Sequence, residues 1–314
     1  MVYLSKKTTT LILTVCLLLN AECLVAQQGG GGGEQPSEGG EQPSEGGEQP
    51  SEGGETEQGG PQDTDYCALD GSDTYMAVTV DAETRTVESS GCPNYDWSSQ
   101  TTPGGASDNG HVNVFPVEPV VCTEPTAYVG VYWTNDNLTD ANMVGQGAVQ
   151  GAIGVAFNGV PIFGNADGAR VDAYISEGHT FNQCNGHSGP GGGYHYHAQV
   201  PDECLLEQPT EGAHSDLFGI LADGIPIYGP LGDNGEVPTD LDECNGHTDE
   251  THSFYHYHVA SDYEYPYIVN CLKGQVDFEQ WSMVGSAGGA EDCTAAEEQY
   301  DYSFLETDFA TLDL

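Results

Sequence analysis

The chain has 314 residues, of which 50 are acidic and only 5 are lysine or arginine, so its formal net charge is −45. A chain this acidic repels the phosphates of nucleic acid, which excludes nucleic acid as a partner. Its expected partners are cations: calcium, transition metals, basic proteins and the cationic face of a mineral. A simpler interpretation is that the charge only keeps an exported protein soluble.

Residues 1–26 are predicted to be a secretory signal sequence. Two lysines precede an apolar run over Leu11–Leu19, and small residues near Ala26 offer a cleavage point. The run is shorter than the roughly 20 residues that a membrane helix needs, and no second run approaches that length. The mature chain is therefore expected to be secreted and extracellular, without a membrane partner. Without the signal it keeps 49 acidic and 3 basic side chains.

Residues 27–64 are predicted to be a disordered acidic spacer. The heptapeptide EQPSEGG occurs three times between Glu34 and Gly54, and the segment has no large apolar residue to bury. Without burial, the entropy lost on ordering is not offset.

Residues 65–150 are predicted to be a β-rich region, because short runs of valine and aromatic residues alternate with turn residues. Met76–Val80 and Arg85–Ser90 are expected to be paired strands, and Ala127–Trp133 alternates strongly. Asn137 lies in an Asn-Leu-Thr sequon, which predicts glycosylation in an exported protein.

Residues 151–285 contain a duplicated unit. Gly154–Gly164 and Gly219–Gly229 each place Asn-Gly or Asp-Gly between apolar flanks, which predicts two hairpins with type I′ turns. Each hairpin is followed by an acidic loop, then CNGH, then YHYH, then a cysteine. Two copies in the same order indicate an internal repeat. The fold class expected is mainly β: a disulfide-stapled sandwich or barrel-like domain, followed by an acidic tail over residues 286–314.

The YHYH segments carry the candidate chemistry. In an extended strand, residues two apart share a face, so His195 and His197 lie on one face and their tyrosines on the other, as do His256 and His258. If the two copies face each other, the four imidazoles meet at one point. The histidines of CNGH are candidate additional ligands, namely His187 and His247. Nitrogen-rich sites favour copper, zinc, nickel or iron over calcium, and copper or zinc is the expected cofactor.

Two other uses of these histidines remain open. They can hydrogen-bond loop carbonyls and brace the fold, or they can act as catalytic acids and bases. The remaining histidines lack a duplicated context and are interpreted as ordinary polar residues: His111, His179, His214 and His252.

Eight cysteines follow the signal, and in an exported chain they are expected to form four disulfides. The symmetry of the repeat suggests Cys184 with Cys204 and Cys244 with Cys271. The flanking cysteines are then Cys67, Cys92, Cys122 and Cys293.

Acidic loops beside turn glycines are candidates for weak calcium binding, although none matches the EF-hand pattern. The candidate residues are Asp167, Asp233, Asp240 and Asp242. The alternative is that they are solvated turn residues.

The duplicated YHYH, with CNGH and DGIPIYG before it, resembles the YHYH-domain family over about Gly154–Gly274. The resemblance implies a β-rich extracellular module, and the biochemical role of the family is poorly defined. The first copy has GPGGG where the second has DETHSF, so the copies are not interchangeable. In composition alone, the chain is similar to acidic skeletal organic matrix proteins of stony corals.

We expect a non-enzymatic, secreted, acidic extracellular-matrix protein that interacts with calcium or mineral and with matrix components. Its histidine-rich core is expected to be structural or to hold a transition metal. The alternatives are a copper- or iron-dependent extracellular oxidoreductase and a metal-scavenging binding module. No nucleophile elbow, phosphate loop, HExxH or dinucleotide fingerprint is present in the sequence.

Overall fold

The computed structural model describes residues 66–102, 104–129, 151–169, 171–189, 192–204, 210–281 and 293–305. The predicted signal sequence, the predicted spacer and the Asn137 sequon lie outside the described residues. Within the described ranges no helix is both long enough and apolar enough to cross a membrane.

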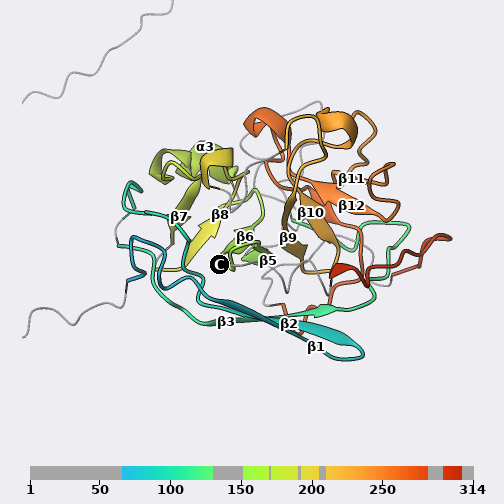
Figure 1. The fold of residues 1–314 in the computed structure, drawn as a ribbon, viewed down its shortest axis with the longest axis horizontal. Helices are drawn as coiled ribbons and strands as arrows, with labels where there is room; N and C mark the ends of the chain where they lie inside the picture. Colours follow the sequence, from blue (N-terminus) through green and yellow to red (C-terminus); the bar gives the residue numbers. More distant parts are fainter. Residues whose placement is uncertain are drawn as a thin grey trace, which may run out of the picture. The chain divides into compact units, whose positions relative to one another are not determined.

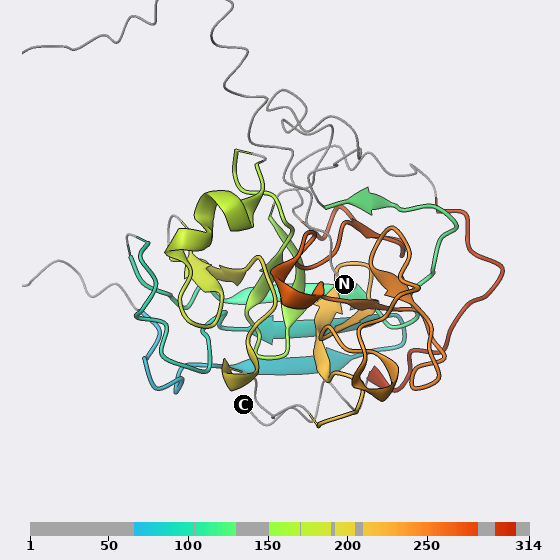
Figure 2. The same ribbon diagram turned by 90° about the horizontal axis from the view of Figure 1, so that it is seen from above.

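A three-stranded antiparallel sheet opens the described chain. It consists of β1 (Met76–Val80), β2 (Thr84–Ser89) and β3 (His111–Pro116), in that order. The expected pairing of the first two strands is confirmed, with Val78 opposite Val87. In Figures 1 and 2 this sheet lies beneath both copies of the repeat. Trp281 Nε1 donates to Val114 O at 3.0 Å, so the C-terminal part of the chain packs onto the same sheet.

The duplicated unit forms one eight-stranded sheet in the order β11-β12-β10-β9-β5-β6-β8-β7 (Figure 1). The first copy supplies β5 (Ala152–Ala156), β6 (Pro161–Phe163), β7 (Gly186–Ser188) and β8 (Tyr194–Tyr196). The second supplies β9 (Leu217–Leu221), β10 (Pro226–Tyr228), β11 (Gly246–His247) and β12 (His256–His258). The two halves repeat each other's order outward from the β5–β9 pair, which confirms the internal repeat.

Antiparallel pairing of β5 with β9 joins the two copies, with Val155 opposite Ile220. Within each copy, the YHYH strand pairs in parallel with the second hairpin strand: β8 with β6 and β12 with β10. The expectation that four histidines converge on one point is wrong. Four strands separate β8 from β12, and five strand spacings of about 4.8 Å amount to roughly 24 Å along the sheet. The apolar hairpins pair with each other at the centre, so the histidine strands lie toward the two edges.

Both hairpins form as predicted, but not with type I′ turns. Gly159 and Gly224 have φ of +80° and +82°, whereas Asn158 and Asp223 are not among the residues with positive φ. Gly159 N donates to Ala156 O at 2.9 Å and Gly224 N donates to Leu221 O at 2.8 Å. Each loop is therefore a three-residue connection that ends in a left-handed glycine. The turn begins one residue earlier than the Asn-Gly pattern suggests.

Helices are short in the described ranges. Helix α3 (Ala173–Glu177) begins after Asp172, whose side chain accepts from Ile175 N. Four 3₁₀ turns are described: η1 (Gly178–Thr180), η2 (Asp202–Cys204), η3 (Asp233–Gly235) and η4 (Ser261–Tyr263). Two further short strands pair with each other, β4 (Ala127–Tyr128) and β13 (Cys271–Leu272). Of the alternating run Ala127–Trp133, only this first part lies in the described residues.

One hydrophobic core unites the β-rich region, the repeat and the C-terminal segment; it includes Val87, Ile220 and Leu305. Four disulfides staple it, and both pairings suggested by repeat symmetry are confirmed: Cys184–Cys204 and Cys244–Cys271. The flanking pairs are Cys67–Cys92 and Cys122–Cys293. The described part of the predicted acidic tail, residues 293–305, is thus bonded to the β-rich region.

Candidate metal sites

The first histidine cluster forms where β7 runs antiparallel to β8, which places His187 opposite His195. His197 follows His195 by two residues and therefore shares its face of the strand. The Nε2 atoms of His187 and His195 lie 3.1 Å apart, as do those of His195 and His197. All three side chains are buried. The sequence prediction of a shared face is confirmed within this copy.

Backbone carbonyls fix the orientation of the two YHYH rings. His195 Nδ1 donates to Gly193 O at 2.9 Å, and His197 Nδ1 donates to Gly164 O at 2.6 Å. A carbonyl only accepts, so each Nδ1 carries the hydrogen and each neutral ring presents an Nε2 lone pair. Two lone pairs that face each other at 3.1 Å cannot form a hydrogen bond. A cation between them resolves the conflict.

His187 is oriented in the same way by a threonine. Thr180 Oγ1 lies 2.7 Å from His187 Nδ1 and donates its own hydrogen to Glu177 O at 2.6 Å. The hydroxyl therefore accepts from Nδ1–H, and the Nε2 of His187 joins the other two as a free donor atom. This arrangement, in which the outer ring nitrogen is held by a carbonyl or hydroxyl, is usual for histidines that ligate metals.

Burial keeps the three imidazoles neutral. Together with a smaller effect of the neighbouring imidazoles, it lowers the pKa of His187 and of His195 to about 3 and that of His197 to about 4. Neutral imidazole is the form that binds a metal. At neutral pH these rings therefore need no deprotonation before they bind a cation.

A carboxylate lies beside the first cluster, near two of its three histidines. Glu177, at the end of α3, places Oε2 3.7 Å from the Nε2 atoms of both His187 and His197. Burial raises the pKa of this carboxyl group. Phe163 stacks on His195 with ring centroids 4.0 Å apart and shields the cluster with apolar surface. Three nitrogens and one carboxylate match a four-coordinate zinc site.

The second cluster repeats the first on β11 and β12, where His247 lies opposite His256. The Nε2 atoms of His256 and His258 are 3.1 Å apart. His256 Nδ1 donates to Phe254 O at 3.0 Å, and His258 Nδ1 donates to Gly229 O at 2.6 Å. Burial lowers the pKa of His256 to about 2 and that of His258 to about 3.

Asp249 supplies the carboxylate of the second cluster, from the loop after β11 and not from a helix. Its Oδ2 lies 3.9 Å from His247 Nε2 and 4.0 Å from His256 Nε2, and its side chain is 6% exposed. His247 Nδ1 donates to Asp240 Oδ1 at 2.9 Å, which directs Nε2 toward the cluster. The four donors of His247, Asp249, His256 and His258 all lie within 4.8 Å of one another.

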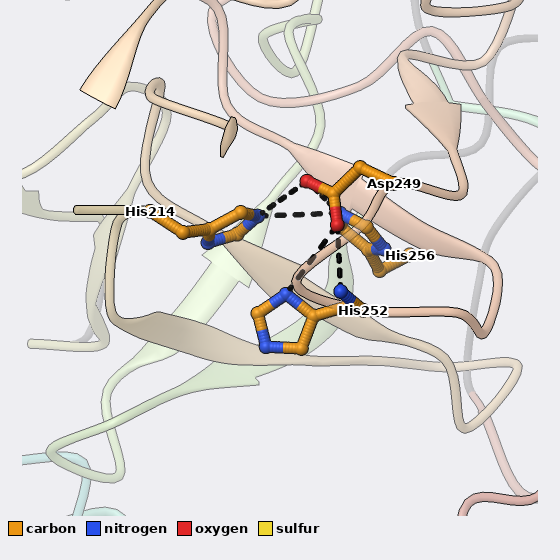
Figure 3. Close-up of side chains that lie close together, drawn as sticks. All are labelled: His214, Asp249, His252 and His256. Atoms are coloured by element: carbon orange, nitrogen blue, oxygen red, sulfur yellow. Dashed lines mark hydrogen bonds and ion pairs between the residues drawn. The ribbon is translucent and has the colours of Figure 1, made fainter. Parts of the chain in front are cut away.

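Two more histidines join the second cluster, although sequence reasoning set them aside as ordinary polar residues. Figure 3 shows His214, His252 and His256 arranged around the carboxylate of Asp249. His214 Nε2 lies 3.3 Å from Asp249 Oδ2 and 3.4 Å from His256 Nε2. The available signal was the DETHSF segment, which brings a carboxylate and an imidazole next to YHYH. His111 and His179 belong to none of the three groups found among the described residues that can hold a metal ion.

The tyrosines lie on the opposite strand face, as predicted, where they are buried and hydrogen-bonded. Tyr196 OH accepts from Asn158 Nδ2 at 3.0 Å, and at the equivalent place Tyr257 OH donates to Asp223 Oδ2 at 2.7 Å. Gly246 in the second CNGH packs against Tyr255, since a Cβ on this glycine would lie 2.2 Å from the hydroxyl oxygen. Close packing on this face holds each histidine strand in position.

The four aspartates proposed for calcium serve mainly as local acceptors. Asp167 accepts from Val171 N at 2.8 Å, Asp233 accepts from Glu250 N at 2.8 Å, and Asp242 accepts from Cys244 N at 2.9 Å. Together with Asp240, they are absent from the potential metal groups of the described chain. Weak calcium binding at these residues stays a prediction.

Comparison with known proteins identifies one family. Residues 134–236 match the family described as YHYH protein. The match includes the first CNGH and YHYH segments and the second hairpin, and it ends before Cys244. No curated protein and no solved structure matches the chain. The compositional similarity to coral matrix proteins is not tested by these comparisons.

Proposed function

We propose that the YHYH module of this chain is a transition-metal binding unit with one histidine site in each copy of its repeat. The geometry of the first histidine cluster is the main support for this proposal. Three buried imidazoles direct their Nε2 atoms at one another, with that of His195 3.1 Å from those of His187 and His197, while their Nδ1 atoms are held by other groups.

The two competing uses of the histidines account for less of this geometry. Bracing of loops explains the contacts of Nδ1, but it gives no reason for several Nε2 lone pairs to face each other. Acid-base catalysis near neutral pH requires a pKa near the working pH. Burial holds the pKa of His195 at about 3 and that of His197 at about 4, far below that range.

Zinc is the metal that suits the first site best. A tetrahedral ion with bonds of about 2.0–2.1 Å places its ligand atoms about 3.3–3.4 Å apart. The observed Nε2 separations of 3.1 Å are close to this value, and Glu177 Oε2 at 3.7 Å needs only a small movement. Copper(II) binds such donor sets more tightly than zinc, so the metal present depends on supply.

In this proposal the chain binds and holds the metal outside the cell, and no catalysis is assigned to it. Four disulfides support export, since they persist in oxidising compartments. If Glu177 joins the three histidines, four protein donors close the first site, as in structural or storage zinc sites, whereas catalytic zinc keeps one position open. A matrix or mineral-binding role would be a further property of the acidic surface, and it rests on charge alone.

Metal content tests the proposal. The full mature chain is loaded with zinc, dialysed, and analysed by inductively coupled plasma mass spectrometry. We compare wild type with His195→Gln, which alters the first site, and with His179→Gln, which replaces an exposed imidazole outside both clusters. We expect His195→Gln to lose one ion per chain and His179→Gln to lose none.

Retention of the full metal content by His195→Gln would reject the first site. Folding of each variant is checked by its disulfide content and circular dichroism, because a variant that unfolds also loses its metal. Stoichiometric metal in the wild type, together with displacement by a chelator, provides an independent measurement on unaltered protein.

A further inference from the structure

The second histidine cluster has more donors than one tetrahedral ion uses. They fall into two overlapping groups, and within each group all donor atoms lie within 4.8 Å of one another. One group contains His247, Asp249, His256 and His258; the other contains His214, Asp249, His252 and His256. Each group by itself has the four donors of a complete tetrahedral shell. A single four-coordinate ion would leave two of the five imidazoles unused.

Several of these donor atoms have no other role in the described chain. His247 Nε2, Asp249 Oδ2 and His252 Nδ1 are buried and have no hydrogen-bond partner among the described residues. A buried polar atom without a partner destabilises the folded chain, because it loses its hydrogen bonds to water and gains none in return. Three such atoms within one cluster indicate that bound cations contact them.

In its neutral form, His214 cannot donate a hydrogen bond to Asp249. Its Nδ1 donates to Ser215 O at 2.7 Å, so the neutral ring presents an Nε2 lone pair. That lone pair faces Asp249 Oδ2 at 3.3 Å and the Nε2 of His256 at 3.4 Å. In both contacts, the Nε2 lone pair of neutral His214 therefore faces another hydrogen-bond acceptor. A cation placed among these atoms turns both repulsive contacts into coordination.

We propose that the second cluster holds two transition-metal ions bridged by the carboxylate of Asp249, so that the chain binds three ions in total. One ion is bound by His247 and His258, the other by His214 and His252, and both share Asp249. His256 has a single Nε2 lone pair and ligates one of the two. This inference rests on the proposed function, since it presumes that the clusters bind metal. Figure 3 shows the carboxylate at the centre of the second group.

The first cluster lacks the residues that would make it binuclear. The segment that carries Asp249 and His252 in the second copy is replaced in the first by the glycine-rich run from Gly189 to Gly193, which offers no ligating side chain. The carboxylate of the first site comes instead from Glu177 on α3. The first site therefore holds one ion, and two related strands give sites of different nuclearity.

Copper(II) is the probe that distinguishes one ion from two. Two ions that share a carboxylate lie about 3.5–4 Å apart, close enough for their electron spins to couple. We load the full mature chain with copper(II), dialyse it, measure copper by mass spectrometry, and integrate the paramagnetic resonance signal. We expect three copper ions per chain, with an integrated spin well below the copper content because the paired ions couple.

The outcomes separate the two proposals. Two copper ions per chain with full spin intensity would overturn the binuclear site and leave the proposed function standing; His214 and Asp249 would then be an ion pair. No copper after dialysis would overturn both. The variant His214→Gln with His252→Gln should lose one ion and regain full spin intensity, whereas His179→Gln should behave as wild type. If the double variant misfolds, the wild-type measurement decides.

Discussion

Single residues distinguish the two copies of the repeat, whose strands follow the same order. Asn158 and Asp223 occupy the same turn position, and each contacts the second tyrosine of its own YHYH strand. The amide is neutral, whereas the carboxyl group is wholly buried, and burial raises its pKa to about 6 despite hydrogen bonds from Tyr257, Gly274 and Ile225. The second copy therefore has a buried carboxyl group that can titrate, where the first copy has a neutral amide.

Replacement of Asp223 by Asn is expected to remove a pH dependence of stability. Between its unfolded pKa of 3.8 and its folded pKa of about 6, the folded state binds the proton more tightly. The wild-type contribution therefore falls as pH rises through this window, by on the order of 3 kcal/mol. Urea unfolding at pH 4.5 and pH 7.5 should show Asp223→Asn gaining stability relative to wild type at the higher pH. If the difference in stability between wild type and Asp223→Asn is the same at both pH values, the pKa of Asp223 is not raised in the folded state.

Close packing of glycine against tyrosine gives a second prediction at the residue scale. A methyl group at position 246 would overlap the hydroxyl of Tyr255, so Gly246→Ala must displace the ring or the CNGH loop. Overpacking of this kind costs roughly 1–3 kcal/mol, and the displacement should weaken metal binding at the second site.

Thermal unfolding and metal retention check this prediction. Gly168→Ala is the matched control, because a Cβ there meets no atom within 4 Å. Equal melting temperatures for the two variants would show that the glycine is not required for packing.

At the scale of elements, strands β8 and β12 each present histidines on one face and tyrosines on the other. Sequence alone predicted this division, because alternation along a strand is a local property. It also predicted the stapling of each histidine strand by Cys184–Cys204 and Cys244–Cys271. Which strands become neighbours is decided by long-range packing of the apolar hairpins. The pairing of β5 with β9 therefore could not be predicted from the repeat, and neither could the separation of the two clusters.

The candidate ligands that sequence reasoning missed lie outside the repeated pattern. Glu177 reaches its site from a short helix, and His214 comes from the segment before β9. Asp249 and His252 lie in the segment before YHYH, where the second copy has DETHSF and the first has GPGGG. A search for duplicated residues therefore finds the shared part of each site and overlooks the part that makes the sites different.

Removal of metal should make the histidine strands sensitive to acid. In the metal-free chain, burial lowers the pKa values of His187, His195 and His197 to about 3, 3 and 4, from 6.5. Below pH 6.5 the unfolded state binds these protons and the folded state does not, so stability is lost as pH falls. These three groups alone contribute about 4 kcal/mol per pH unit, and His256 and His258 of the second cluster, whose pKa values burial lowers to about 2 and 3, add to this slope.

Urea midpoints of chelator-treated protein at pH 7.5, 6.5 and 5.5 measure this slope. Restored zinc should raise the midpoint at pH 7.5, because a ligand that binds only the folded state stabilises it. Equal midpoints at pH 7.5 and 5.5 without metal would contradict the burial of neutral rings.

At the scale of the whole molecule, the acidic surface predicts a second class of cation binding. With 49 acidic and 3 basic side chains after the predicted signal, the mature chain should bind many calcium ions weakly, in the millimolar range. Calorimetric titration should show this binding decline as sodium chloride is raised from 10 to 150 mM, since salt screens exposed charges. His195→Gln should leave the calcium titration unchanged. One tight, salt-resistant calcium ion would instead indicate a built site.

The β5–β9 pair, which joins the halves of the eight-stranded sheet, has a consequence for a shortened chain. A fragment covering the first copy alone would leave the hydrogen-bonding edge of β5 bare, and a bare edge recruits another strand. Two identical fragments could then pair through β5 in a two-fold arrangement that imitates the natural junction. We expect such a fragment to elute from a sizing column as a dimer that carries two copies of the simpler metal site.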